Sequence, residues 1–263
     1  KLIRVNLSDL AAKGAVPHAL LLCAAFPRET TEAWLDRFGA GLAADIAAYA
    51  VPLIGGDTVA TPGPLTLSLT ALGVSEPGRE LLRSGATAGE SIWVSGTLGD
   101  AALGLMVLQG NLTVPPEDAA FLADRYHLPQ PRTTLGPRLV GLARAAMDVS
   151  DGLGGDLGHM AKASGVGMEI EMDRLPLSPA ARRAVAADAG LLAKSVSGGD
   201  DYEIVLTAPI GAEGTLQALA VELGVALTRI GRVIPGSGVV LIDACGQPLS
   251  GLPQGYRHFT GGG

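Results

Sequence analysis

The chain has little of the composition that supports binding to polyanions or membranes. Its 19 Lys and Arg residues are outnumbered by 26 Asp and Glu residues, which gives a formal net charge of −7. No basic excess therefore offers a surface to a nucleic-acid backbone or an acidic membrane by charge alone. The longest apolar runs, such as "ALLLCAAF", are far shorter than the roughly 20 residues that span a bilayer. We expect no nucleic-acid partner, no membrane partner and a cytoplasmic location.

Cysteine and the familiar catalytic patterns are also scarce. The two cysteines, Cys23 and Cys245, form no Cys-x-x-Cys pair and have no histidine partner nearby in the sequence. We therefore expect buried cytosolic thiols rather than a disulfide or a metal site. No Ser-His-Asp or Cys-His arrangement is evident, so we assign no catalytic side chain and interpret the histidines as structural. The P-loop and GxGxxG nucleotide-binding patterns are absent too.

The residues that are present predict an α/β (α+β) fold with two domains. A composition of 48% hydrophobic and 17% charged residues is globular, and 263 residues suffice for two domains. Apolar residues at helical spacing predict a helix over 30–50, with Trp34, Phe38 and Tyr49 as core residues. A short apolar run, a glycine turn and an alternating strand are expected over 51–75.

The second half alternates between strands and helices. The expected order is strand 91–96, a helix from Gly99, strand 145–150, helix 151–165, strand 166–172, helix 178–190, strand 202–209 and helix 214–224. A polar link near residue 86 divides an N-terminal domain, residues 1–85, from a C-terminal domain, residues 86–263. The chain begins inside a patterned element and without an initiator Met, so we expect a further segment upstream.

Acidic residues recur beside Ser, Thr or Gly at the ends of apolar segments. They stand in "VNLSDLAA", "LIGGDTVA", "MDVSDGL" and "VSGGDDYEIV", as Asp9, Asp57, Asp148, Asp151, Asp200, Asp201 and Glu203. Helix capping explains any single one at least as well as function does, because Asp and Ser are favoured N-caps.

Capping does not explain the combination of these motifs. Carboxylates beside a core and without basic neighbours are costly. Magnesium prefers carboxylate oxygens and shares them with substrate phosphates, and adjacent glycines let backbone amides approach phosphate oxygens. The motifs therefore predict a metal-dependent phosphate site.

The same residues carry a family resemblance. The segments "VNLSDLAAKGAVP", "LIGGDT", "RSGA", "DVSDGLGGDLGHMAKASGVG", "GGDDYEIVLT" and "GYRHF" occur in the order and spacing of the thiamine-monophosphate kinases. This family lies in the aminoimidazole ribonucleotide synthetase-like superfamily, and the match covers nearly the whole chain. The resemblance implies an N-terminal sheet-and-helix domain that joins its partner in a homodimer, a C-terminal α/β domain, and ATP bound between the domains. The implied reaction is Mg²⁺-dependent, direct in-line transfer of a phosphoryl group from ATP to thiamine monophosphate.

The resemblance also implies roles for particular residues. As magnesium ligands it gives Asp9, Asp57, Asp148 and Asp151. As nucleotide contacts it gives Gly56, Asp57, Arg83 and Ser150. Asp200 and Tyr256 match positions that touch thiamine monophosphate.

The chain departs from the family pattern in two places. Lys13 stands where the family has Met, which we interpret as a tolerated change. The Gly-Asp-Asp and Thr-Thr-Asp segments that supply further metal ligands have no counterpart here. Two alternatives therefore stay open: another ATP-dependent synthetase of the superfamily, or a non-catalytic protein that binds nucleotide or thiamine phosphate.

Overall fold

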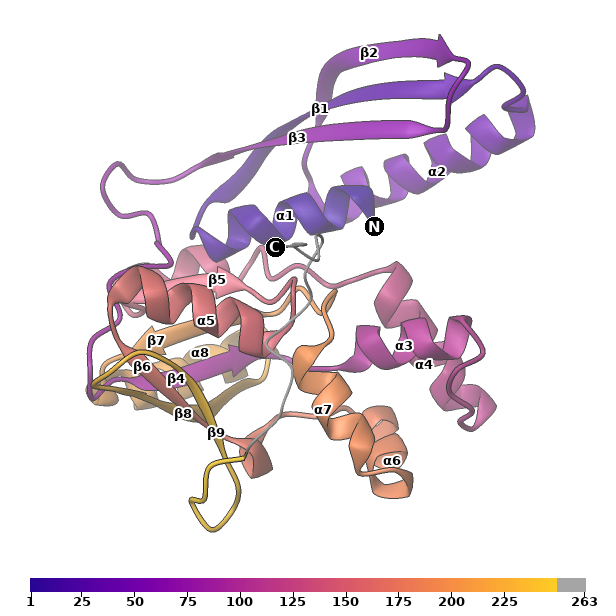
Figure 1. Cartoon of the computed structure of the whole chain (residues 1–263). Helices are drawn as coiled ribbons and strands as arrows, with labels where there is room; N and C mark the ends of the chain where they lie inside the picture. The colour runs from indigo at the N-terminus through magenta and orange to yellow at the C-terminus, as the bar shows by residue number, and fades with distance from the viewer. Residues whose placement is uncertain (250–263) are drawn as a thin grey trace, which may run out of the picture.

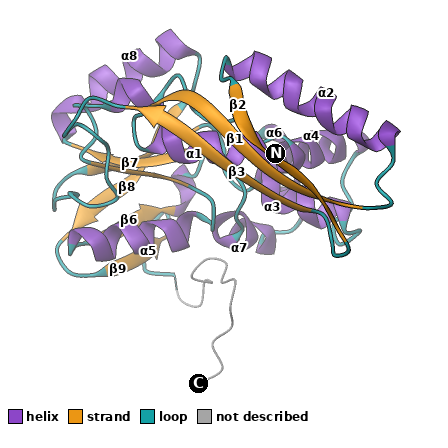
Figure 2. Ribbon diagram, turned by 90° about the horizontal axis from the view of Figure 1, so that it is seen from above, coloured by secondary structure: helices purple, strands orange, loops and turns teal. Residues whose placement is uncertain are grey.

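The computed structural model describes residues 1–249, and two β-sheets organise them. The N-terminal unit consists of α1 (Leu2–Ala12), β1 (Val16–Pro27), α2 (Glu32–Tyr49), β2 (Leu53–Thr61) and β3 (Thr66–Val74). Its sheet has the order β2-β1-β3, with β1 parallel to β2 and antiparallel to β3. Helix α1 lies between this sheet and the rest of the molecule (Figure 1), and the three strands cross over it in the view from above (Figure 2).

The C-terminal unit is built on a mixed sheet of order β5-β7-β4-β8-β6-β9. Its strands are β4 (Ser91–Ser95), β5 (Ala145–Asp148), β6 (Gly167–Glu171), β7 (Ile204–Ala208), β8 (Leu227–Ile234) and β9 (Gly238–Ile242). Its helices are α3 (Asp100–Leu108), α4 (Pro116–His127), α5 (Leu153–Ser164), α6 (Pro179–Ala187), α7 (Gly190–Ser197) and α8 (Glu213–Leu223). Short 3₁₀ turns η1 (Gly136–Leu139), η2 (Met172–Arg174) and η3 (Ile210–Ala212) complete it.

The period-two alternation of the central strand β4 divides the core between the two faces of the large sheet. Ile92 and Val94 pack into the cluster that α5 covers with Leu153 and Leu157. Trp93, between them in sequence, points to the opposite face, where the cluster includes residues of α8 and the end of α1. Because both faces are covered, every residue of β4 is buried. The face of the large sheet that carries Trp93 therefore packs against both α8 and the end of α1.

Most of the predicted elements are confirmed. The strand over 91–96, the helix that follows Gly99, and the helices over 151–165 and 214–224 are β4, α3, α5 and α8. Helices α4 and α7 were missed. Helix α4 nevertheless carries readable start signals, since Pro116 is its first residue and two acidic residues follow in its first turn.

Three sequence predictions are wrong. The glycine turn expected within 51–75 is continuous strand, because Gly56 adopts φ +145° inside β2 and a Cβ there would lie 1.8 Å from the carbonyl oxygen of Leu22. Cys23 and Cys245 are both exposed: Cys23 falls on the outward side of β1, between buried neighbours, and Cys245 lies in a turn after β9.

The third error concerns the aromatic residues of α2. Trp34 and Phe38 are half-buried rather than core residues, and they pack with Phe26 of β1 at ring-centroid separations of 5.9 and 5.8 Å. A three-stranded sheet has too little area to enclose the whole apolar face of an 18-residue helix.

No helix within residues 1–249 is both long and apolar enough to cross a membrane.

Candidate active site

Two of the acidic motifs are joined by backbone hydrogen bonds. Strands β5 and β7 are antiparallel neighbours, which places the end of "DVSDG" beside the start of "GGDDYE". The amide of Asp200 donates to the carbonyl of Ser150 at 2.9 Å, and the amide of Tyr202 donates to the carbonyl of Val149 at 2.8 Å. Gly199 permits this approach, because a Cβ there would lie 2.2 Å from the Ser150 carbonyl oxygen. The fold therefore holds both motifs in one fixed arrangement.

Helix α1 brings the third motif to the same place. The hydroxyl of Ser8 donates to Oδ2 of Asp148 at 2.9 Å, and both side chains are buried. Ser8 and Asp9 lie in the middle of α1, so the capping explanation is wrong for them. It is also wrong after β5, where the N-cap of α5 is Gly152 without a side-chain cap. The motif residues are thus available for another task.

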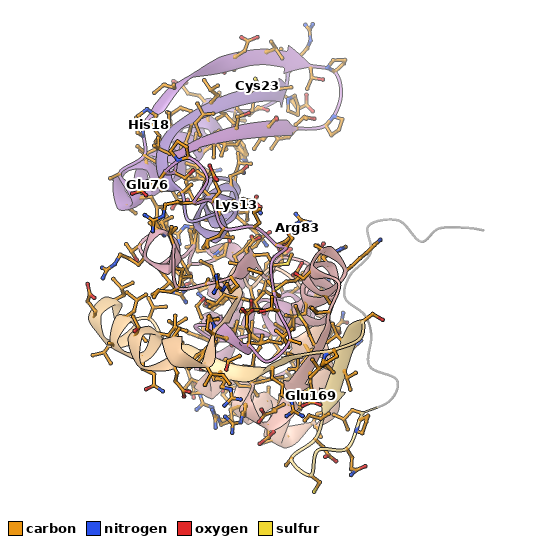
Figure 3. The ribbon with its side chains drawn as sticks, turned by 90° about the vertical axis from the view of Figure 1, so that its left-hand side faces the viewer. Lys13, His18, Cys23, Glu76, Arg83 and Glu169 are labelled. Atoms are coloured by element: carbon orange, nitrogen blue, oxygen red, sulfur yellow. The ribbon has the colours of Figure 1, made fainter. Side chains whose placement is uncertain are left out.

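Burial raises the pKa values of two carboxyl groups at this junction, those of Asp148 and Asp9. Burial, with the charge of Asp9 as the second cause, raises the pKa of Asp148 to about 6. Burial also raises the pKa of Asp9, although the nearby cations of Lys13 and Arg83 oppose the change. Figure 3 shows Lys13 and Arg83 where the N-terminal sheet meets the C-terminal unit. Perturbed carboxyl groups in a cleft are typical of functional sites.

Asp156 supports the loop between β5 and α5. Its Oδ2 accepts hydrogen bonds from the backbone amides of Ser150 and Asp151, at 3.0 and 3.1 Å. Burial raises its pKa to about 7, despite the opposing effect of these hydrogen bonds. Asp156 stood in the sequence motif but was given no role. It fixes the backbone of the two residues whose side chains enter the cleft.

These elements enclose a cleft of about 950 Å³. The lining residues are Val5, Asp9, Ala101, Ala102, Leu105, Met106, Asn111, Tyr126, Asp148, Ser150, Asp151, Lys194, Ser197, Gly198, Gly199, Asp200 and Tyr202. We call the part of the lining formed by Asp9, Asp148, Ser150 and Asp151 the acidic end, and apolar residues of α3 form another part. A cleft with acidic and apolar parts suits a ligand that joins a phosphate to an organic ring system.

The cleft gathers only part of the predicted site. Asp9, Asp148, Ser150, Asp151 and Asp200 line it. Gly56 and Asp57 do not, because β2 carries them on the three-stranded sheet, where Asp57 is exposed. Arg83 also stands outside the lining, although its charge acts on Asp9. Tyr256 lies outside the described residues.

Sequence reasoning missed three residues at or beside the cleft: Lys1, Tyr126 and Tyr202. The ammonium of Lys1 lies 3.1 Å from Oδ2 of Asp200 and 3.7 Å from the ring centroid of Tyr126. The hydroxyl of Tyr202 donates to Oδ1 of Asp200 at 3.0 Å. Tyr202 lies within the motif "GGDDYE", but no role was predicted for it. Nothing in the sequence around Tyr126 indicated a role.

A buried ionic network lies beneath the cleft. Glu203 is fully buried and accepts hydrogen bonds from Arg132 at 2.6 and 2.5 Å and from Arg125 at 3.1 Å. The neighbouring Asp201 accepts from the backbone amides of Gly99 and Ala101 at 2.7 and 3.3 Å. Burial raises the pKa of Asp201 well above its usual value. Asp201 and Glu203 of "GGDDYE" are therefore structural, and they anchor the segment that carries Asp200.

The donor set at the acidic end fits a hard divalent cation. Its side chains offer only oxygen atoms, and Asp148 is a buried carboxyl whose charged form is disfavoured by its surroundings. A bound cation that takes carboxylate oxygens would stabilise the charged form of such a buried carboxyl group. Within residues 1–249, no three His, Cys, Asp or Glu side chains stand close enough together to hold a metal ion by themselves. A cation at this end would share its coordination with phosphate and water.

Comparison with known proteins places this geometry in a known class. The N-terminal domain of AIR synthase related proteins matches residues 1–75, and the C-terminal domain of these proteins matches residues 87–244. The two sheets and the cleft beside α1 thus define an AIR synthase related fold.

Individual relatives show which family within this class the chain belongs to. Thiamine-monophosphate kinase of Salmonella typhimurium is 44% identical over 261 residues, which are 99% of this chain and 79% of the relative. The crystal structure of thiamine-monophosphate kinase from Stenotrophomonas maltophilia K279a is 44% identical, with a TM-score of 0.85, and covers 91% of this chain and 76% of that one. A structure of AaThiL complexed with AMPPCP and TMP also has a TM-score of 0.85, at 30% identity, and covers 98% of this chain and 78% of that one. The chain belongs to the thiamine-monophosphate kinase family, a family of kinases.

Proposed function

We propose that this protein transfers the γ-phosphoryl group of ATP to thiamine monophosphate, forming thiamine diphosphate and ADP with Mg²⁺ present. The observation that carries the proposal is the meeting of α1, "DVSDG" and "GGDDYE" at one cleft. The relatives named as thiamine-monophosphate kinases support the substrate, and the AaThiL structure with AMPPCP and TMP supports an adenine nucleotide and a TMP ligand.

The acidic end of the cleft binds the phosphates in this proposal. Asp9, Asp148 and Asp151 would contribute carboxylate oxygens to Mg²⁺, with phosphate and water completing its coordination, and the ion would supply charge neutralisation for the phosphoryl oxygens. The side chain of Ser150 and the surrounding loop amides orient the transferred group. Asp156 keeps that loop in place through its two backbone hydrogen bonds. Arg83 adds a cationic contact at the junction of the two units.

The acceptor supplies its own nucleophile. A phosphate monoester has a second pKa of about 6, so its oxygen is largely ionised at neutral pH and needs no general base. Direct in-line transfer without a covalent intermediate is consistent with the positions of three histidines. His18, His127 and His159 are exposed and do not line the cleft, so they are not placed to act as a base or nucleophile there. Catalysis then depends on position and charge neutralisation.

We further propose that the protein works as a homodimer joined through the three-stranded sheet. The sheet exposes several large apolar side chains: Val16, Leu53, Ile54, Val59, Leu72 and Val74. Exposed apolar area of this kind is typical of interaction surfaces. Gly56 and Asp57 lie on the same sheet and remain proposed nucleotide and metal contacts. Tyr256 remains a proposed substrate contact.

The test is ADP release by the full-length protein with ATP and thiamine monophosphate, with Mg²⁺ present or chelated, and with product identified by chromatography. Asp148→Asn keeps the shape and the acceptor for Ser8 but removes the charge, and we expect at least about 100-fold lower kcat. The control is Asp36→Asn, an exposed acid of α2.

Each outcome separates the alternatives. Metal-dependent formation of thiamine diphosphate that Asp148→Asn abolishes and Asp36→Asn leaves intact supports the kinase. Nucleotide binding without any transfer by the wild type supports the non-catalytic alternative. ADP release that needs a different small-molecule acceptor supports another synthetase of the superfamily.

A further inference from the structure

Two residues that line the cleft, Tyr126 and Asp200, hold a cation between them. The ammonium of Lys1 lies 3.7 Å above the ring centroid of Tyr126 and 3.1 Å from Oδ2 of Asp200. The other carboxylate oxygen of Asp200 accepts the hydroxyl proton of Tyr202 at 3.0 Å. The arrangement therefore combines an aromatic face with a carboxylate held in one orientation, which is the chemistry that binds a positively charged nitrogen.

The fold fixes the aromatic side of this arrangement. Tyr126 lies in the last turn of α4, directly after Arg125. Arg125 forms ion pairs with the buried carboxylates of Glu203, at 3.1 Å, and Asp100, at 3.8 Å. Because the neighbouring residue is tied into the buried network, the ring of Tyr126 is presented to the cleft in a fixed position. Lys1, in contrast, has a flexible stem and a side chain that is 29% exposed.

We propose that Tyr126 is a specificity-determining residue, whose ring forms with the Asp200 carboxylate a subsite for the permanently cationic ring of the phosphate acceptor. The identity of that ring as a thiazolium rests on the proposed function. The ammonium of Lys1 lies in this subsite, and binding of the substrate would displace it. The assignment of Asp200 came from family resemblance, whereas Tyr126 and Lys1 come from the structure.

The position of the subsite agrees with the shape of such an acceptor. The same cleft is lined by Asp9 and Asp148, which suit the phosphate, and by Leu105 and Met106, which suit an uncharged ring. A quaternary nitrogen bound in this cleft cannot lose a proton to become neutral. It therefore needs a counter-charge when it leaves water, and Asp200 supplies one.

The experiment compares two ligands by isothermal titration calorimetry on the full-length protein with Mg²⁺ and without nucleotide. One ligand is thiamine monophosphate, and the other is its neutral isostere in which carbon replaces the quaternary nitrogen. We expect the wild type to prefer the cationic ligand by about tenfold. Tyr126→Leu should reduce this preference to about twofold or less, while Tyr126→Phe should keep it.

Two further variants sharpen the comparison. Lys1→Met removes the internal competitor, so it should tighten binding of the cationic ligand severalfold and leave the neutral ligand unchanged. Phe121→Leu changes an exposed aromatic residue of the same helix, outside the cleft, and should alter neither affinity. Thermal unfolding of each variant separates loss of binding from loss of folding.

Equal binding of both ligands by the wild type would overturn the subsite. So would a Tyr126→Leu variant that weakens both ligands by the same factor, because the ring would then contribute only packing. If the wild type binds neither ligand, the proposed function itself fails and this assignment falls with it. That result is distinguishable, since loss of discrimination alone leaves thiamine monophosphate binding intact.

Discussion

Removal of the charge of Glu203 should destabilise the whole C-terminal unit. Glu203 precedes β7, is fully buried, and neutralises the guanidinium groups of Arg132 and Arg125. It also accepts the hydroxyl proton of Ser95 at 2.6 Å. Glu203→Gln keeps the size of the side chain but removes the counter-charge of Arg132 and leaves Arg125, among the described residues, with only Asp100, at 3.8 Å.

The expected loss follows from the burial of the network. Breaking a buried ion pair by removing one partner costs about 3–5 kcal/mol. The amide oxygen of Gln still accepts one hydrogen bond, so the lower half of that range applies, about 3–4 kcal/mol. For a chain of this size, about 1 kcal/mol shifts Tm by roughly 2–4 °C. The variant should therefore unfold about 10 °C below the wild type.

The assay is thermal unfolding followed by circular dichroism, with Glu222→Gln as the matched control. Glu222 pairs with both terminal nitrogens of Arg138, at 2.8 and 2.9 Å, but this pair is exposed. Exposed pairs contribute little because water and salt screen them. We expect no measurable change for Glu222→Gln. Equal losses in the two variants, or none in Glu203→Gln, would refute the reasoning that burial sets the magnitude.

Three further predictions concern the rest of the molecule. The pKa of Asp156 is raised from 3.8 to about 7 in the folded protein, so the stability that Asp156 contributes is present below pH 3.8 and is lost as the pH rises towards 7. The Tm measured with chelator should therefore fall between these pH values, and it should fall less in Asp156→Asn. Ile54→Lys should give a monomer by light scattering while Ile210→Lys, equally exposed but on the C-terminal unit, should not; a dimer in both would exclude the three-stranded sheet as the interface. Gly199→Ala should abolish thiamine monophosphate binding in calorimetry, whereas Gly158→Ala, which has open space for a Cβ, should bind as the wild type does.

Local patterns in the sequence predicted the elements well but could not place them against one another. The apolar periodicity of α5 and the alternation of β4 depend only on neighbouring residues. The junction of "DVSDG" with "GGDDYE" depends instead on the antiparallel register that sets Asp148 opposite Ile204. That register joins segments more than 50 residues apart, and no local signal encodes it. The sequence therefore predicted that the acidic motifs form one site, but not the contacts that bring them together.

The distinction between structural and cleft-facing acids was equally invisible in the sequence. Asp200 and Asp201 are consecutive and chemically identical. Asp200 lines the cleft, while Asp201 is buried against the start of α3 and caps its free amides. The backbone makes the difference: Asp200 and Tyr202 both adopt positive φ values, +74° and +54°, and this reverses the direction of successive side chains. Such conformations are costly for non-glycine residues and persist where surrounding contacts enforce them.

Lys13 shows how a substitution gains meaning only from its surroundings. By sequence it was a tolerated replacement of Met near an acidic motif. In the structure it follows Asp9 by four residues, at the end of α1, a spacing that brings two side chains together on one helix face. Its charge opposes the rise in pKa of both Asp9 and Asp148, so it helps to keep these carboxylates ionised. The same charge would repel the divalent cation that we propose to bind there. We therefore expect Lys13 to supply part of the positive charge at the acidic end of the cleft and to lower the affinity for that cation relative to a chain with Met at this position.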